Sequence, residues 1–164
     1  MTLDYMAFFA DQDLEKKVEE LNWSSGPDIA VFFQSLEKEH RLKVWGNSTE
    51  AWPLNAVTEW LKATCGLQNF GSELGRRLLT KCDYVHLVLP PAEIKLVLSR
   101  IQDLSPENDE TFDGSIEDFF SDMGLEYVDS FLGDGMGEFY QLFREFRADL
   151  LSNQDKTLIV LIPG

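Results

Sequence analysis

Short apolar runs in the sequence alternate with longer stretches in which apolar residues recur every three or four positions. Three of the runs, at residues 3–10, 84–89 and 157–162, predict β-strands, because they are short, rich in aromatic or aliphatic side chains, and followed by polar residues or by proline. A shorter run at residues 42–45 also fits a strand. The three longer runs therefore predict a small sheet of about three strands.

Helical spacing of apolar residues predicts helices between these strands. The expected helices cover residues 12–21, 27–36, 53–64, 72–81, 94–104, 115–123, 125–132 and 136–151. Residues 28–33 also fit a strand, and residues 115–132 fit either one helix or two. We expect an α+β fold, with a single domain over residues 1–164 in which six or seven helices pack on the small sheet.

The size and composition of the chain are those of one soluble domain. It has 164 residues, 44% of them hydrophobic, and twelve Phe and four Trp residues supply material for a core. The start of the chain, Met1-Thr2-Leu3-Asp4, is acidic rather than basic as in a secretory signal, and no apolar stretch approaches the ~20 residues that span a bilayer. Cys65 and Cys82 are expected to be reduced thiols, because a chain with this much core has little need of a disulfide. We therefore expect a cytoplasmic location.

Negative charge is concentrated in one part of the sequence, which we call the acidic block (residues 103–138). The block has no Lys or Arg and contributes −12 to a formal net charge of −15, whereas the other 128 residues hold 17 acidic and 14 basic residues. Its carboxylates belong to Asp103, Glu107, Asp109, Glu110, Asp113, Glu117, Asp118, Asp122, Glu126, Asp129, Asp134 and Glu138. Solubility alone would tolerate interspersed lysines, and like charges at i,i+4 spacing cost about 0.2–0.5 kcal/mol per pair. The block therefore predicts an ordered helical surface whose negative charge serves recognition.

The sign of this charge selects the kind of partner. A localised negative field repels nucleic acid and anionic membranes and speeds encounter with a basic protein. We expect the partner to contact Asp113, Glu117, Asp118, Asp122, Glu126, Tyr127, Asp129, Asp134 and Glu138. Tyr127 belongs to this set as an aromatic anchor among the carboxylates.

Two segments of the acidic block resemble ligand-binding loops. Residues 109–117 match several positions of a calcium-binding EF-hand loop, but its closing carboxylate would fall on Phe120. Residues 133–137 form a glycine-rich turn before a helix, but Glu138 stands where a dinucleotide-binding motif has its last glycine. We therefore expect no metal and no cofactor.

Side chains suited to catalysis are few. The chain has two histidines, His40 and His86, and Cys82 and His86 would lie about 13 Å apart along a strand, too far for proton transfer. We expect His86 at the edge of the core with a hydrogen-bonded ring nitrogen. The sequence contains no nucleophile elbow, P-loop, zinc-protease or CxxC motif, so no catalytic residues are expected, although a hydrolase built on two carboxylates stays open.

Both ends of the chain resemble the YfbM-like family of small bacterial proteins, whose function is generally unassigned. The resemblance lies in an opening strand that runs into an acidic-capped helix at Met6–Glu15, and in an aromatic helix and terminal strand at Phe139–Phe143 and Lys156–Val160. The family's Trp-Asp pair is not matched, since Trp45 is followed by Gly46. The resemblance implies an α+β bacterial fold similar to domains found as immunity proteins beside secreted toxins.

The sequence thus predicts a non-enzymatic, bacterial, acidic binding protein. The leading hypothesis is an immunity protein, a toxin inhibitor that occludes the basic active site of its toxin by a protein–protein interaction. A second hypothesis is a DNA-mimic inhibitor of a DNA-binding or defence enzyme, which would need carboxylates spaced like phosphates along a rod. The third is a small enzyme or ligand-binding domain with its site near His86, Cys82 and Asp83.

Overall fold

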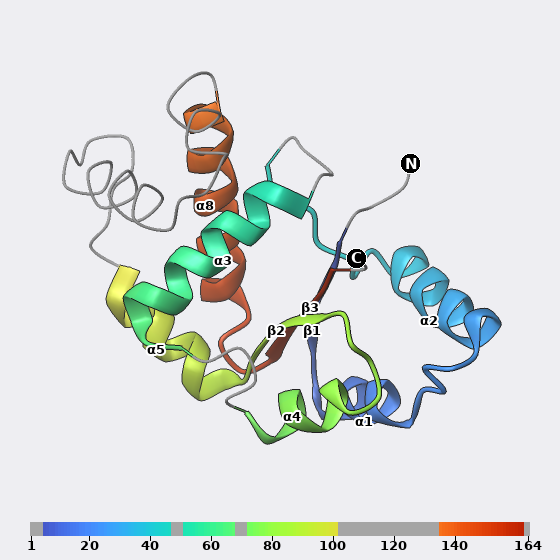
Figure 1. The fold of residues 1–164 in the computed structure, drawn as a ribbon. Coiled ribbons are helices and arrows are strands. Elements are labelled where there is room, and N and C mark those ends of the chain that lie inside the picture. Colours follow the sequence, from blue (N-terminus) through green and yellow to red (C-terminus); the bar gives the residue numbers. More distant parts are fainter. Residues whose placement is uncertain (1–4, 47–50, 68–71, 102–134, 163–164) are drawn as a thin grey trace.

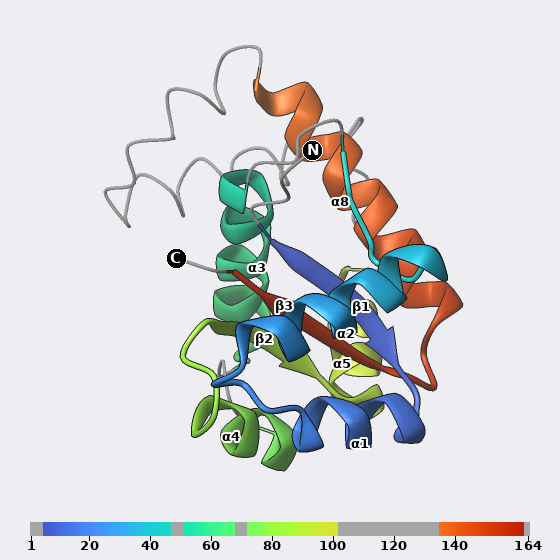
Figure 2. The same ribbon diagram turned by 90° about the vertical axis from the view of Figure 1, so that its right-hand side faces the viewer.

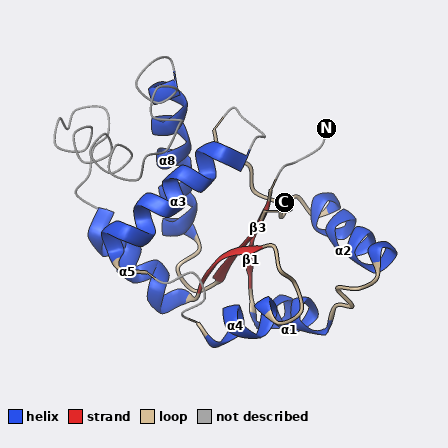
Figure 3. Cartoon of the chain, viewed as in Figure 1, coloured by secondary structure: helices blue, strands red, loops and turns tan. Residues whose placement is uncertain are grey.

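The protein folds around a three-stranded sheet with helices on both faces (Figures 1 and 3). The computed structural model describes residues 5–46, 51–67, 72–101 and 135–162, except for the side chains of residues 51–53 and 135–140. The strand order is β1-β3-β2, and the strands are β1 (Met6–Ala10), β2 (Val85–Leu89) and β3 (Thr157–Leu161). Both outer strands pair antiparallel with β3, so β1 and β2 run parallel to each other. The three predicted strands are confirmed.

The described residues form six helices that lie in two layers, one on each face of the sheet. The helices are α1 (Gln12–Glu20), α2 (Gly26–Lys38), α3 (Ala51–Cys65), α4 (Glu73–Leu79), α5 (Pro91–Ile101) and α8 (Gly135–Ser152). Helices α1, α2 and α4 cover one face, and α3, α5 and α8 cover the other, as the two perpendicular views show (Figures 1 and 2). This arrangement confirms the predicted α+β fold.

Side chains of successive strand residues enter two separate cores because they alternate between the faces of the sheet. In β3, Leu158 and Val160 belong to the core beneath α3, α5 and α8, whereas Ile159 and Leu161 belong to the core beneath α1, α2 and α4. The first core contains the largest buried side chains, including Trp60 and Phe143. Strand β3 is completely buried because it is central and covered on both faces.

Polar side chains fix where several helices begin. The Asp11 carboxylate accepts a hydrogen bond from the Leu14 amide at the start of α1, and the Ser25 and Ser72 hydroxyls cap α2 and α4 in the same way. Such caps satisfy amides that have no partner inside the helix. The cap at Ser25 explains why residues 28–33, which also fit a strand, belong to helix α2.

The segment after α2 connects the sheet with α8 but is not the predicted strand at residues 42–45. It shares one backbone hydrogen bond with β1, from the Lys43 amide to the Ala7 carbonyl. The next contact is made by a side chain, because the Trp45 amide donates to the Tyr5 hydroxyl at 3.0 Å. The indole of Trp45 then donates to Asp149 of α8 at 2.6 Å. Two side chains thus take the place of a strand ladder.

Both cysteines are free thiols in the interior of the protein. Burial raises the pKa of the Cys65 and Cys82 thiols, which keeps them protonated at neutral pH. Within the described parts of the chain, no helix has the length and apolar character needed to cross a bilayer.

Candidate functional site

The path of the chain creates a cleft at one end of the sheet. Strands β1 and β2 are parallel and flank β3, so their carboxyl ends lie at the same end of the sheet. From there β1 leads into α1 on one face, whereas β2 leads into α5 on the opposite face. In open α/β sheets, ligands bind where neighbouring connections leave toward opposite faces, because the diverging helices leave a crevice there.

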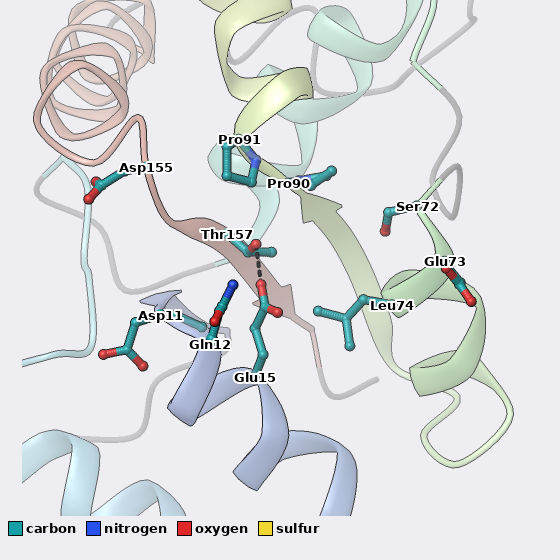
Figure 4. Close-up of a pocket in the computed structure, with 11 residues that line it drawn as sticks. Asp11, Gln12, Glu15, Ser72, Glu73, Leu74, Pro90, Pro91, Asp155 and Thr157 are labelled. Atoms are coloured by element: carbon teal, nitrogen blue, oxygen red, sulfur yellow. Dashed lines mark hydrogen bonds between the residues drawn. The ribbon is translucent and has the colours of Figure 1, made fainter.

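A pocket of about 450 Å³ occupies this position (Figure 4). Its lining residues are Ala10, Asp11, Gln12, Glu15, Ser72, Glu73, Leu74, Pro90, Pro91, Asp155 and Thr157. They come from both β–α connections, from the start of α4 and from the start of β3. The volume lies within the range of ~300–1,000 Å³ that is usual for small-ligand sites.

Three polar side chains meet at the centre of the pocket. Glu15 and Gln12 extend from α1 toward β3, where the Thr157 hydroxyl donates a hydrogen bond to Glu15 Oε1 (Figure 4). Thr157 is only 3% exposed, so its hydroxyl is held by the sheet and fixes the carboxylate in turn. Leu74 and the two prolines, Pro90 and Pro91, supply apolar walls around this polar centre.

The pocket has a negative field. Besides Glu15, the carboxylates of Asp11, Glu73 and Asp155 lie at its rim, and among the described lining residues none is Lys, Arg or His. Glu73 forms an ion pair with Arg77 at 3.2 Å, and Asp11 caps α1. The N-termini of nearby helices oppose this field, but each carries only about half a positive charge. Arg77, which pairs with Glu73 and also lies within electrostatic range of Glu15, offsets part of this charge. The lining side chains keep a net negative charge, which favours a cationic ligand.

A second group of polar side chains surrounds His86 in β2. The strand has an irregularity between Val85 and Leu87, so His86 has no partner in β3. An extra residue of this kind re-aims side chains, and here the His86 Nε2 lies 2.6 Å from Thr58 Oγ1 of α3. The Thr58 hydroxyl lies 3.0 Å from the Asn55 carbonyl, to which it donates. A hydroxyl has one proton to give, so we assign the His86 Nε2–H as the donor to Thr58.

Lys62 completes this second group from the next turn of α3. Its ammonium lies 3.1 Å from Glu59 Oε1 and 3.3 Å from the His86 carbonyl, and the side chain is only 6% exposed. Burial and then the nearby Lys62 charge lower the pKa of His86 to about 3. The imidazole is therefore neutral near pH 7, and its hydrogen-bonded nitrogen agrees with the prediction for His86.

The third sequence hypothesis placed His86 and Cys82 in one site, and the structure separates them. His86 contacts α3, whereas Cys82 packs into the core on the opposite face of the sheet. Close to Cys82, burial raises the pKa of the Tyr84 hydroxyl to about 12. A thiol–imidazole pair is therefore not formed, and the raised pKa of the Cys82 thiol disfavours its thiolate, the nucleophilic form, at neutral pH.

The partner-contacting residues predicted from the sequence lie outside the described residues. These are Asp113, Glu117, Asp118, Asp122, Glu126, Tyr127, Asp129 and Asp134, together with the side chain of Glu138 on α8. The sequence reasoning in turn missed the pocket, because Thr157 is far in the chain from Gln12 and Glu15, the other two central residues. The sequence does contain one signal, the pair of strand-to-helix turns at Ala10–Gln12 and Leu89–Pro91. These turns indicate a site only when the strand order is known, because that order places them at the same end of the sheet.

Comparison with known proteins gave no match to a family model, to a curated protein or to a solved structure. The resemblance to the YfbM-like family therefore stays a prediction.

Proposed function

We propose that this chain is a non-enzymatic binding protein that recognises a basic protein. The supporting observation is the distribution of charge, because the acidic block contributes −12 of the net −15 without a single Lys or Arg. The rest of the chain is nearly balanced in charge, and its described residues pack into two hydrophobic cores. Negative charge that is concentrated in one segment attracts the cationic surface of a partner and orients the partner toward that segment.

The mechanism that we propose has two steps. The negative field first speeds encounter with the partner by about 10- to 1,000-fold at low ionic strength. Contacts between carboxylates and Arg side chains then lose water and slow dissociation. The proposed contact includes Glu117, Asp118 and Asp122, with Tyr127 as the aromatic anchor.

The more specific form of this proposal is an immunity protein that occludes the active site of a toxin. An enzyme that acts on nucleotides or nucleic acid has a cationic active site, since its substrate is anionic. A negative inhibitor competes for those cationic groups directly. Inhibition by occlusion needs no catalytic group in the inhibitor.

The decisive test reverses three charges of the acidic block together, in Glu117→Lys, Asp118→Lys and Asp122→Lys. The matched control reverses Glu20, Glu37 and Glu39, which are exposed and lie outside the block. Both variants change the net charge by six, from −15 to −9, so they differ only in where the charge is lost. The partner is first isolated by affinity capture with the unmodified chain and identified by mass spectrometry. Association with that partner is then measured by surface plasmon resonance at several salt concentrations, and rescue of cell growth is measured by coexpression.

We expect the block variant to associate at least roughly tenfold more slowly at low salt and to lose growth rescue, with thermal stability unchanged. The control variant should keep most of both. Equal association rates of the block variant and the unmodified chain would refute the role of the block. Coexpression of the unmodified chain that fails to rescue growth from the captured partner would refute the immunity function.

A further inference from the structure

The pocket at the carboxyl ends of β1 and β2 has a chemistry of its own, independent of the acidic block. We propose that it binds one organic cation, an alkylammonium or alkylguanidinium group, with the charged head at Glu15 and the alkyl stem along Leu74, Pro90 and Pro91. This inference goes beyond the proposed function, because it concerns a different part of the chain and holds whether or not the block has a protein partner.

The Glu15 carboxylate is held in a fixed position in the pocket, where it can bind a cation. This carboxylate stands inside a cavity of about 450 Å³ and is held toward β3 by the hydroxyl of buried Thr157. A carboxylate fixed before binding loses little conformational freedom when a ligand arrives. Gln12 lies next to it (Figure 4), and its amide, once turned to direct the oxygen toward Glu15, would supply a second acceptor for the N–H groups of a cation.

The acids of the described chain fall into two groups by how their charge is compensated. Glu19, Glu20, Glu39, Glu59 and Glu73 each form an ion pair within 4.0 Å with a Lys or Arg. In the described part of the chain no such pair involves Glu15, Asp11 or Asp155, and Asp11 is used instead as a helix cap. Arg77 acts on Glu15 only through a longer-range electrostatic interaction, so a cation bound at Glu15 would add a direct contact without displacing an existing ion pair. Glu15 differs from other unpaired acids among the described residues, such as Asp13 and Glu37, because its carboxylate lines a pocket.

The walls of the pocket select an organic cation over a metal ion. Within the described residues there is no group of three or more His, Cys, Asp or Glu side chains that could hold a metal. The apolar part of the lining, from Ala10, Leu74, Pro90 and Pro91, offers nothing to an inorganic ion. It suits the methylene stem of a lysine-like or arginine-like group, which packs on apolar surface while its head remains with polar partners.

The nearby helix N-termini raise the opposite possibility of an anion, which the side chains exclude. Helix α1 begins at the pocket, but its Asp11 cap already occupies the Leu14 amide, and Ser72 occupies the Gly75 amide of α4. An anion would also enter a cavity that has Glu15 at its centre and further carboxylates at its rim. Repulsion by these full charges exceeds the attraction of the partial charges at the helix ends.

The proposal is tested on the full chain with n-butylguanidinium as the probe. Binding is followed by two-dimensional NMR of the backbone amides and of the Gln12 side-chain amide, with n-butylurea as a neutral probe of similar shape. Two variants carry the same chemical change on the same helix, Glu15→Gln inside the pocket and Glu20→Gln on the exposed side of α1. Glutamine keeps an oxygen that can accept the Thr157 hydrogen bond, so Glu15→Gln should fold.

We expect saturable shifts at Gln12, Thr157 and their neighbours with n-butylguanidinium and none with n-butylurea. Glu15→Gln should weaken binding by roughly tenfold or more, as the loss of a charge-assisted hydrogen bond implies, and Glu20→Gln should leave it unchanged. The absence of saturable shifts, equal binding by the neutral probe, or equal binding by Glu15→Gln would each overturn the proposal.

The source of the cation is distinguished in a second arm with a blocked Gly-Arg-Gly peptide. Binding of both the peptide and the free probe would support an arginine side chain of another protein as the occupant. Binding of the free probe alone would support a small amine or guanidine. The two proposals are separable, because reversal of Glu117, Asp118 and Asp122 should leave n-butylguanidinium binding intact, while Glu15→Gln should leave growth rescue by the acidic block intact.

Discussion

The two polar groups beside the sheet differ in how their charges are satisfied. At His86, the ammonium of Lys62 and the imidazole are bonded to Glu59, to Thr58 and to the backbone, and Lys62 is almost completely buried. At the pocket, the Glu15 carboxylate has one side-chain hydrogen bond within the described residues, from Thr157, and Arg77 acts on it only at longer range. A closed network of this kind stabilises one arrangement of the fold, whereas a fixed charge that faces a cavity is suited to recognition.

Because of this difference, we expect the largest change in the free energy of unfolding when the pH is lowered, and we expect it to come from His86. The pKa of His86 is about 3 in the folded protein, against an ordinary value of 6.5. Between these two pH values the unfolded chain binds a proton at His86, whereas the folded protein does not. The free energy of unfolding should therefore fall from about pH 6.5 downward, by about 3 kcal/mol at pH 4 from this residue alone. Urea denaturation at several pH values, followed by tryptophan fluorescence, measures this loss.

The control for the pH effect is His86→Gln, which removes the titrating group and keeps a side-chain N–H that can donate to Thr58. The acidic residues titrate equally in both proteins, so the difference between their pH profiles isolates His86. Parallel profiles from pH 7 to pH 4 would show that His86 is not held neutral by the fold.

The next largest effect is expected at Lys62. Replacement by methionine keeps the buried stem but removes the charge that Glu59 and the His86 carbonyl share. We expect a loss of about 2 kcal/mol in the free energy of unfolding, less than for a fully buried pair because Glu59 is 35% exposed. The matched control is Lys16→Met, whose pair with Glu20 is exposed and should be worth at most about 0.5 kcal/mol. Equal losses in the two variants would contradict a closed network at His86.

The smallest effect on stability is expected at Glu15. We expect Glu15→Gln to change the free energy of unfolding by less than about 1 kcal/mol, since the Thr157 bond can be kept and no ion pair is broken. Chemical denaturation at neutral pH, in parallel with Lys62→Met, measures the contrast. A loss at Glu15 as large as that at Lys62 would show that Glu15 holds the fold together rather than serving a ligand.

The sequence predicted most elements of the fold because their local signals agree. The runs at residues 84–89 and 157–162 become β2 and β3, and the helical spacing from Leu14 to Val18 becomes the buried side of α1. The run at residues 42–45 failed as a strand, because Tyr5 and Asp149 provide side-chain partners for Trp45 in place of a backbone ladder. Local pattern carries no information about such long-range bonds.

The candidate site was much less predictable than the fold. Thr157 and Glu15 are 142 positions apart, and only the central place of β3 between β1 and β2 brings them together. The irregularity at His86 was equally hidden, because residues 85–89 read as an ordinary apolar strand. The predicted partner surface of the acidic block lies outside the described residues and stays a prediction.

The Lys62 contact with the His86 carbonyl has a consequence for the behaviour of the protein at high concentration. An outer strand offers unpaired backbone groups to which a second molecule can add its own strand, a common start of aggregation. In β2 the irregularity breaks the regular row of these groups, and a lysine ammonium covers one of its carbonyls. On the other outer strand, the Lys43 amide occupies the Ala7 carbonyl. A sheet of only three strands thereby hinders intermolecular strand addition at both of its sides.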